Sequence, residues 1–343
     1  MSRPSPEPAT TAAAAALLVY GLRVRIEGAW PEVVDAVRRD FAWFERPLAE
    51  AEATVTVAVE PRPPDFDRFG SIPAAFVTPR NVVYQDGQRT IVDYFGRALS
   101  VLDRRTGRIE IEGEDAHLVH EAAYQFLLSR IGAHLDARGL VRLHSLGLAG
   151  RSGGVAVMLP SGGGKSTLGL RALGDERALL VSEDTPLLDR KGRLHPFPLR
   201  IGINPTDAAG LPEGAVRQIE RMEFHPKLVL DLDAFADRIA TTSVPLAHIV
   251  VGRRSLGTEA RLERAPRRLA AGALLREAVV GVGVYQGLEF LLQQGWRDAF
   301  GKAGVGATRA ACCAAALRHA TVWSLTVGRD RERNWEALSP LLD

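Results

Sequence analysis

Lysine, cysteine and long apolar runs are scarce in this chain of 343 residues. The 43 basic and 41 acidic side chains leave a formal net charge of +2, which provides no overall field to attract nucleic acid or an anionic membrane. No apolar stretch of about 18 or more residues is free of charge, so we expect no transmembrane helix. We therefore expect neither nucleic acid nor a membrane as a partner, and any polyanion must be bound locally.

The two cysteines, Cys312 and Cys313, are adjacent. Neighbours on a chain cannot form an ordinary structural disulfide or a spaced pair of metal ligands. We expect them to be small core residues of a reduced, cytoplasmic protein. The apolar run 12–20 continues directly into a strand-like segment, so it does not predict a signal peptide.

The length predicts about two domains, given roughly 150 residues per domain. We expect a flexible N-terminal tail over residues 1–16, an α+β domain over 17–138, and a second domain over 139–343 with a helical C-terminal part from about 269. The first domain contains alternating and helical patterns. The strands are expected at 18–26, 53–59, 89–94, 98–103 and 107–111, and the helices at 31–44 and 116–137.

His117 and His120 lie three residues apart on the second of these helices. A metal pair needs further ligands, so we expect packed or solvent-facing histidines. In the C-terminal part, apolar positions recur with a helical period and predict a broad apolar face. They are Leu274, Leu275, Val279, Val282, Tyr285, Leu288, Phe290 and Leu291.

The most informative stretch is a strand, a glycine-rich turn and a helix in direct succession. The apolar strand 154–159 leads into Pro160-Ser161-Gly162-Gly163-Gly164-Lys165-Ser166-Thr167, and a helical run follows. Three glycines let the backbone bend so that consecutive N–H groups converge on an anion, and the helix start adds its positive end. The pattern predicts a nucleotide-binding P-loop (Walker A motif). Its binding residues are Ser161, Gly162, Gly163, Gly164, Lys165, Ser166 and Thr167.

In such a loop Lys165 reaches the β- and γ-phosphates, and the Ser166 hydroxyl ligates Mg²⁺. Lys165 is also one of only four lysines in the chain. Leu159 stands where the first glycine of the pattern G-x-x-x-x-G-K-[ST] belongs, so the match is imperfect. The alternative is a glycine-rich helix start with an incidental lysine.

Two carboxylates follow the next apolar strand, 178–181, in the sequence Ser182-Glu183-Asp184. Ligands sit at the carboxyl ends of strands in α/β sheets. One carboxylate can hold Mg²⁺ and the other can accept a proton from an attacking hydroxyl. The alternative is an acidic turn before Pro186.

Three further residues are candidates for the same site. His144 lies on a predicted strand, 143–149, that forms a hairpin with the strand before the loop, which would bring it near the phosphates; a packed histidine is the alternative. Arg200 can pair with a phosphate as a planar fork, or lie at a strand edge. Lys227 is rare by type and precedes a strand, so it is either a substrate or phosphate contact or a solvated lysine. The pair Arg253-Arg254 is expected to be a solvated strand end.

His144, the loop 160–167 and the pair Glu183-Asp184 together resemble the HPr kinase/phosphorylase family and its broader set of relatives. The resemblance covers about residues 140–205. It implies an α/β fold with a mixed-sheet P-loop kinase core, similar to ATP-type phosphoenolpyruvate carboxykinase, beside an N-terminal α+β domain and C-terminal helices. It also implies a homo-oligomer, whereas the apolar C-terminal helices can equally pack on their own core.

By this resemblance Glu183 is the catalytic acid/base, Asp184 and Ser166 hold the metal, and His144 and Lys165 complete the catalytic set. The sequence departs from the family in two places. Glu183 replaces an aspartate, and the stretch 198–202 keeps Arg200 but lacks the glutamate of a Glu-Ile-Arg-Gly signature. These departures argue against HPr itself as the substrate and against the phosphorylase reaction.

The leading hypothesis is a kinase that uses ATP and Mg²⁺ to phosphorylate a hydroxyl, either a serine of a peptide or protein or a small-molecule alcohol. Two alternatives stay open. One is a nucleotide-binding regulatory protein with weak or no catalysis, and the other is a carboxykinase-like enzyme acting on a small carboxylate.

Overall fold

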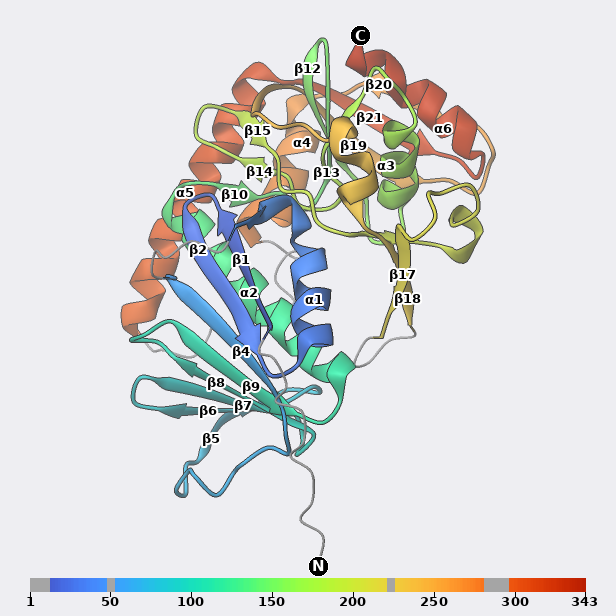
Figure 1. Ribbon diagram of the computed structural model, residues 1–343. Helices are drawn as coiled ribbons and strands as arrows, with labels where there is room; N and C mark the ends of the chain where they lie inside the picture. Colours follow the sequence, from blue (N-terminus) through green and yellow to red (C-terminus); the bar gives the residue numbers. More distant parts are fainter. Residues whose placement is uncertain (1–12, 48–52, 221–225, 281–295) are drawn as a thin grey trace, which may run out of the picture. The chain divides into compact units, whose positions relative to one another are not determined.

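The computed structural model describes residues 13–47, 53–220, 226–280 and 296–343, which form a mixed α/β fold (Figure 1). The chain separates into two compact units. The first holds the described residues up to Ile131 together with 219, 220 and 226, and the remaining described residues form the second. The boundary expected at 138/139 lies just after helix α2 (Ala116–Ala137), which runs from the first unit into the second.

Within the described residues, the first unit is built on a nine-stranded sheet in the order β3-β1-β2-β4-β9-β8-β7-β6-β5. Side chains alternate between core and solvent, as in β2, where Leu22, Val24 and Ile26 are buried. The strands are β1 (Ala13–Val19), β2 (Leu22–Gly28), β3 (Glu45–Arg46), β4 (Val55–Pro61), β5 (Ala74–Val77), β6 (Val82–Asp86), β7 (Arg89–Asp93), β8 (Ala98–Asp103) and β9 (Arg108–Gly113).

The start of this unit differs from the prediction. Residues 13–16, expected in the tail, belong to β1, and the single strand expected at 18–26 is a hairpin of β1 and β2. Alanine has a low strand propensity, so the cross-strand pairing of this run with β2 has little local signal. The hairpin turns at Tyr20 and Gly21, both with positive φ (49° and 87°). A tyrosine is an unusual residue for such a turn, which is why the pattern concealed it.

Helix α1 (Pro31–Asp40) packs against β1 and β2, and a short 3₁₀ turn, η1 (Ala42–Phe44), follows it. The end of α1 also contacts α2: the rings of Phe41 and Tyr124 lie 5.5 Å apart, and His120 Nε2 lies 2.8 Å from Asp40 Oδ2. His120 is therefore a packed histidine with a carboxylate partner, as expected.

The second unit is built around another mixed sheet. Its main path runs β10-β14-β15-β19-β12-β11-β13, while β21 pairs with β19 and β20 with β21. Strands β12, β19 and β21 are parallel, and β11 is antiparallel to both β12 and β13, so β12, β13, β19 and β21 end at the same edge. The strands are β10 (Val141–Arg142), β11 (Leu146–Gly150), β12 (Gly153–Met158), β13 (Leu179–Ser182), β14 (Leu187–Leu188), β15 (Arg193–His195), β19 (Val244–Arg254), β20 (Arg261–Arg264) and β21 (Thr321–Val327).

Helices cover this sheet. Helix α3 (Lys165–Leu173) contacts β11, β13 and α6 (Arg331–Leu338), whereas α4 (Arg267–Leu274) and α5 (Trp296–His319) contact each other and β19. A π-helical turn, η4 (Leu275–Val280), continues α4. The free cysteines Cys312 and Cys313 lie buried on α5 within this core, as predicted. Strands β16 (Ile201–Ile203), β18 (Lys227–Leu230) and β17 (Val216–Ile219) form a small separate sheet, and the remaining 3₁₀ turns are η2 (Pro205–Asp207), η3 (Leu232–Arg238) and η6 (Ser339–Leu342).

The C-terminal part is not wholly helical, contrary to the prediction. Strand β21 lies between α5 and α6 and extends the sheet beside β19. Its sequence, Thr-Val-Trp-Ser-Leu-Thr-Val, is rich in β-branched residues, which favours a strand over a helix. Of the predicted apolar helical face, Val282, Tyr285, Leu288, Phe290 and Leu291 lie outside the described residues.

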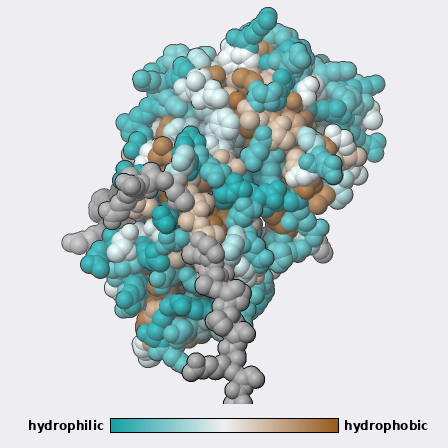
Figure 2. Space-filling model, in the orientation of Figure 1, coloured by the Kyte–Doolittle hydropathy of each residue, from teal (hydrophilic) through white to brown (hydrophobic). Residues whose placement is uncertain are grey.

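Hydrophilic residues cover most of the face in view, and hydrophobic residues form scattered areas between them (Figure 2). In the part of the chain that the structure describes, no helix combines the length and apolar character needed to cross a membrane.

Candidate functional site

The glycine loop, residues 160–167, connects β12 to α3 at the edge where the parallel strands end. Gly162 and Gly164 adopt φ values of +68° and +106°, a region that favours glycine. A side chain on Gly163 would collide with the Pro160 carbonyl oxygen. The loop therefore requires its three glycines, and it ends on the N-terminus of α3, where backbone N–H groups are free of helical partners.

Leu159, which replaces the first glycine of the Walker pattern, has a structural role. Its side chain is buried over Gly252 of β19, where any Cβ would collide with it. On the same strand Arg254 donates from Nη1 to the Gly162 carbonyl oxygen at 2.9 Å. Arg253 and Arg254 are exposed at the end of β19, as expected, and Arg254 in addition contacts the glycine loop.

Lys165 is the first residue of α3, and its side chain is buried. Its Nζ lies 2.9 Å from His144 Nε2, 3.1 Å from the Leu159 carbonyl oxygen and 3.5 Å from Asp184 Oδ1. Lys165 therefore lies among acceptors from three different segments, inside the bend of the glycine loop.

The two acids that follow β13 are both part of this cluster. Ser166 Oγ donates to Glu183 Oε1 at 2.5 Å. Burial and the neighbouring negative charge of Asp184 raise the pKa of Glu183 to about 7, because the Ser166 bond and the charges of Lys165 and Lys227 offset them only in part. Burial also acts to raise the pKa of Asp184, but the bond to His144 and the charge of Lys165 outweigh it and hold that pKa below its ordinary value. The Asp184 side chain is 47% exposed and is the more accessible acid of the two.

His144 lies between β10 and β11, not on the single strand expected at 143–149, because residues 143–145 interrupt that strand. Its Nε2 faces Lys165 and, at 3.2 Å, Asp184 Oδ1. Its Nδ1 lies 2.8 Å from Glu277 Oε2. Burial acts to lower the pKa of His144, but the two carboxylates outweigh it and raise that pKa.

The sequence analysis did not identify Glu277, nor the contact of Arg254 with the glycine loop. Glu277 lies on η4, 133 residues from His144 along the chain, and its only local signal is a lone carboxylate within an apolar helical pattern. Arg254 contacts the loop from 92 residues away. Neither of these long sequence separations belongs to a recognisable motif, so the contacts become visible only in the folded structure.

The remaining two candidates lie on or beside the small sheet. Arg200 is partly buried and directly precedes β16. Lys227 begins β18, and its side chain lies across Gly202, where a Cβ would collide with it. Its charge lowers the pKa of Glu183, so Lys227 is within electrostatic reach of the acid pair.

The donor groups of the cluster are hard oxygens: the Ser166 hydroxyl and the carboxylates of Glu183 and Asp184. Such donors suit Mg²⁺, which takes one or two protein carboxylates and completes its shell with substrate phosphates and water. Among the described residues, no group of three or more His, Cys, Asp or Glu side chains is arranged to hold a metal ion alone. The residues present therefore fit a magnesium ion whose coordination shell is completed by the phosphates of a bound ligand and by water.

Chemically, the cluster combines a glycine loop at a helix N-terminus, a buried cation, a hydroxyl and two acids whose pKa values shift in opposite directions. Comparison of the sequence with models of known protein families and with curated proteins gave no match in either case. The geometry of the cluster is therefore the evidence from which a function is proposed.

Proposed function

We propose that this protein is a cytoplasmic kinase, related to the HPr kinase/phosphorylase family, that transfers the γ-phosphoryl group of Mg²⁺-ATP to a hydroxyl. The acceptor is a serine of a peptide or protein, or a small-molecule alcohol. One observation carries the proposal: a glycine loop brings Lys165 and Ser166 into contact with the acids Asp184 and Glu183 at a single sheet edge.

The glycine loop and Lys165 bind the phosphates. Backbone N–H groups at the start of α3 and the positive end of that helix favour an anion at the loop, whereas the Gly163 N–H donates to the Pro160 carbonyl oxygen. Lys165 is held beside the loop by His144 and the Leu159 carbonyl, so its positive charge adds to the attraction of the loop for phosphate. Arg254, which bonds Gly162, places a second cation at the outer side of the loop.

Ser166 and Asp184 would hold the magnesium ion. The Ser166 hydroxyl donates its hydrogen to Glu183, which leaves its lone pairs free to bind a cation. Asp184 offers a partly exposed carboxylate that stays ionised at neutral pH because its pKa is lowered. When bound, the ion neutralises charge on the transferring phosphoryl group.

Glu183 accepts the proton of the attacking hydroxyl. In the transfer, the acceptor oxygen forms a bond to the γ-phosphorus, the bond from that phosphorus to the β-γ bridging oxygen breaks, and the hydroxyl proton passes to the carboxylate. The products are a phosphate monoester and ADP. A carboxylate whose pKa is raised to about 7 is matched to taking up a proton at neutral pH.

The test is a transfer assay with γ-labelled ATP and Mg²⁺, using wild type, Lys165→Ala and Lys191→Ala. Lys191 is an exposed lysine of the same unit, so its variant is the matched control for loss of one lysine. We expect label transfer to a hydroxyl acceptor, from panels of serine peptides and of small alcohols, that Lys165→Ala abolishes and Lys191→Ala keeps.

ATP binding is measured on the same proteins by calorimetry. Tight binding of ATP with no transfer to either panel, and no release of labelled phosphate, would favour the nucleotide-binding regulatory protein. Absence of ATP binding in the wild type would overturn both functions.

A further inference from the structure

A buried carboxylate on the π-helical turn η4 contacts the site through a histidine. The Glu277 side chain is 8% exposed, and its Oε2 lies 2.8 Å from His144 Nδ1. The Glu277 backbone carbonyl also accepts the His144 N–H at 3.4 Å. Both the ring and the backbone of His144 are thus held by one residue of a distant helix. Single π-helical turns occur frequently at functional sites.

The two oxygens of Glu277 have different partners. Oε1 accepts from Arg276 Nε at 2.6 Å, and the Arg276 side chain is 59% exposed. Oε2 is left for His144. An ionised carboxylate can only accept hydrogen bonds, and the pKa of Glu277 is held below its ordinary value: burial acts to raise it, but Arg276 and His144 outweigh burial. Nδ1 of His144 therefore carries a hydrogen, and Nε2 is the nitrogen turned toward Lys165 and Asp184.

We propose that Glu277 is a positioning residue of this site. By accepting the Nδ1 hydrogen, it fixes the rotation and tautomer of the His144 ring, so that the Nε2 lone pair accepts from Lys165 and keeps that lysine beside Asp184. The consequence for turnover rests on the kinase function proposed above, whereas the effect on the His144 ring does not. Glu277 acts through His144, and we assign it no direct contact with the reacting atoms.

The chain contains a matched pair for comparison. His120 and Asp40 of the first unit also meet at 2.8 Å with both side chains buried, but there the carboxylate binds Nε2 and no glycine loop is part of the contact. Removing the Asp40 carboxylate therefore tests what loss of a buried histidine partner does by itself.

The experiment compares wild type, Glu277→Ala, Glu277→Gln, Arg276→Ala and Asp40→Ala. Imidazole nitrogen NMR, with the His144 signals assigned through His144→Gln, reports which ring nitrogen carries the hydrogen. We expect an Nδ1-protonated ring in the wild type and in Arg276→Ala, and loss of that state in Glu277→Ala. Glu277→Gln, whose amide oxygen still accepts from Nδ1, should retain it in part.

Turnover is then measured at saturating ATP, together with ATP affinity in the absence of metal. Loss of the partner that orients a metal-ligating histidine costs about 10- to 100-fold, and by analogy we expect Glu277→Ala to lower kcat by that factor. ATP affinity should change by less than about threefold, because the loop amides are unchanged and Lys165 keeps its bond to the Leu159 carbonyl oxygen. Glu277→Gln should recover part of kcat, and Arg276→Ala and Asp40→Ala should keep it.

A His144 signal in Glu277→Ala or Glu277→Gln that matches the wild type would overturn the positioning role, and so would an altered ring with unchanged kcat. Equal losses of kcat in Glu277→Ala, Arg276→Ala and Asp40→Ala would reduce Glu277 to a stability residue. If the wild type shows no Lys165-dependent turnover, the kinase function fails, while the NMR comparison still decides whether Glu277 sets the His144 ring. Glu277→Gln, close to isosteric, keeps the test usable if the alanine variant does not fold.

Discussion

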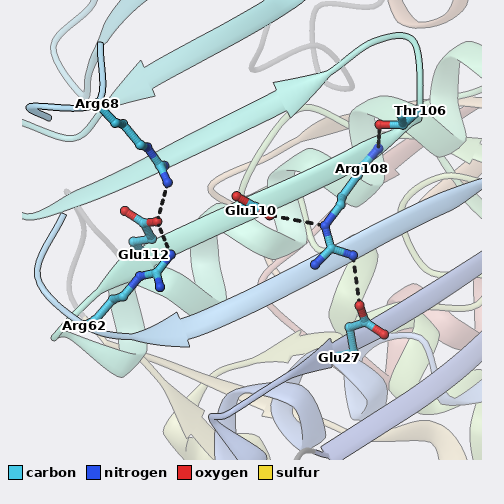
Figure 3. Close-up of polar contacts among 7 residues, drawn as sticks. All are labelled: Glu27, Arg62, Arg68, Thr106, Arg108, Glu110 and Glu112. Atoms are coloured by element: carbon cyan, nitrogen blue, oxygen red, sulfur yellow. Dashed lines mark hydrogen bonds and ion pairs between the residues drawn. The ribbon is translucent and has the colours of Figure 1, made fainter. Parts of the chain in front are cut away.

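Each unit of the protein contains a glutamate that is wholly or partly buried, and the pKa values of the two glutamates shift in opposite directions. Glu112, on β9 of the first unit, has a fully buried side chain that accepts from Arg62 at 2.6 Å and from Arg68 at 2.8 Å (Figure 3). The Asp65 N–H donates a third bond at 3.2 Å. Glu183 of the second unit receives a serine hydroxyl and has another acid next to it.

The pKa shifts follow from these partners. Burial alone acts to raise the pKa of both acids. At Glu112 the two guanidinium groups and the Asp65 N–H outweigh burial, so that pKa is lowered. At Glu183 burial and Asp184 prevail. Glu112 has two arginine partners and a backbone N–H, and these bonds anchor the segment 62–68. Glu183 has one hydroxyl donor and a neighbouring acid, so its carboxylate has the higher affinity for a proton.

The largest expected effect is on phosphoryl transfer, and it comes from changing Glu183. We expect Glu183→Gln to lower phosphoryl transfer by about 100-fold or more, because the amide cannot accept the hydroxyl proton. The free energy of unfolding should not fall, since glutamine keeps an oxygen for the Ser166 hydroxyl and removes a poorly compensated charge. The transfer assay and urea unfolding measure the two quantities.

Glu176→Gln, which changes an exposed acid of the same unit, is the control and should alter neither quantity. Transfer at the wild-type rate in Glu183→Gln would remove Glu183 as the proton acceptor and leave Asp184 as the candidate.

The corresponding change in the first unit should affect stability. Glu112→Gln replaces a charged acceptor of two arginine bonds, so we expect the first unit to lose about 2–3 kcal/mol. Hydrogen exchange in β9 and in residues 62–68 localises the loss. Glu110→Gln, a 40% exposed acid on the same strand, is the matched control and should change exchange little. Unchanged exchange in Glu112→Gln would mean that the carboxylate does not anchor this segment.

The pH dependence of stability should distinguish Glu112 from an uncharged acceptor. Because its pKa is lower in the folded protein, its stabilisation is fully present above the ordinary value of 4.5 and is lost as the pH falls through the folded value. The difference in unfolding free energy between wild type and Glu112→Gln should therefore stay constant from pH 8 to about 6 and shrink below about 4.5. A difference that grows on acidification would contradict the sign of the shift. Urea unfolding of both proteins across this range measures it.

Local patterns predicted the parts of the fold in which neighbours along the chain decide the structure. Helix α2 and strand β8 have the predicted bounds, and the strand–loop–helix around Lys165 follows the glycine pattern. The hairpin at Tyr20 escaped prediction because its turn residue is atypical and its first strand is rich in alanine. Strand β21 escaped because its helical surroundings dominated the pattern.

The candidate site divides in the same way. The contacts of Ser166 with Glu183 and of Lys165 with Asp184 bridge fewer than 20 residues, so a motif and the next strand are enough to anticipate them. Glu277 lies on η4 and Arg254 on β19, and the positions of both elements depend on contacts between distant parts of the chain. A single sequence contains no local signal for such contacts.

The smallest expected effect lies on the same strand as Glu112. Arg108 bonds Glu27 at 2.9 Å and Glu110 at 3.2 Å, but its side chain is 44% exposed (Figure 3). Exposed ion pairs are screened by water and salt, so Arg108→Ala should cost less than about 1 kcal/mol. Hydrogen exchange in β9 at low and high salt measures this. A loss as large as that of Glu112→Gln would mean that charge pairing anywhere on the sheet stabilises the unit. A small, salt-sensitive loss would mean that complete burial of the carboxylate is what makes Glu112 an anchor.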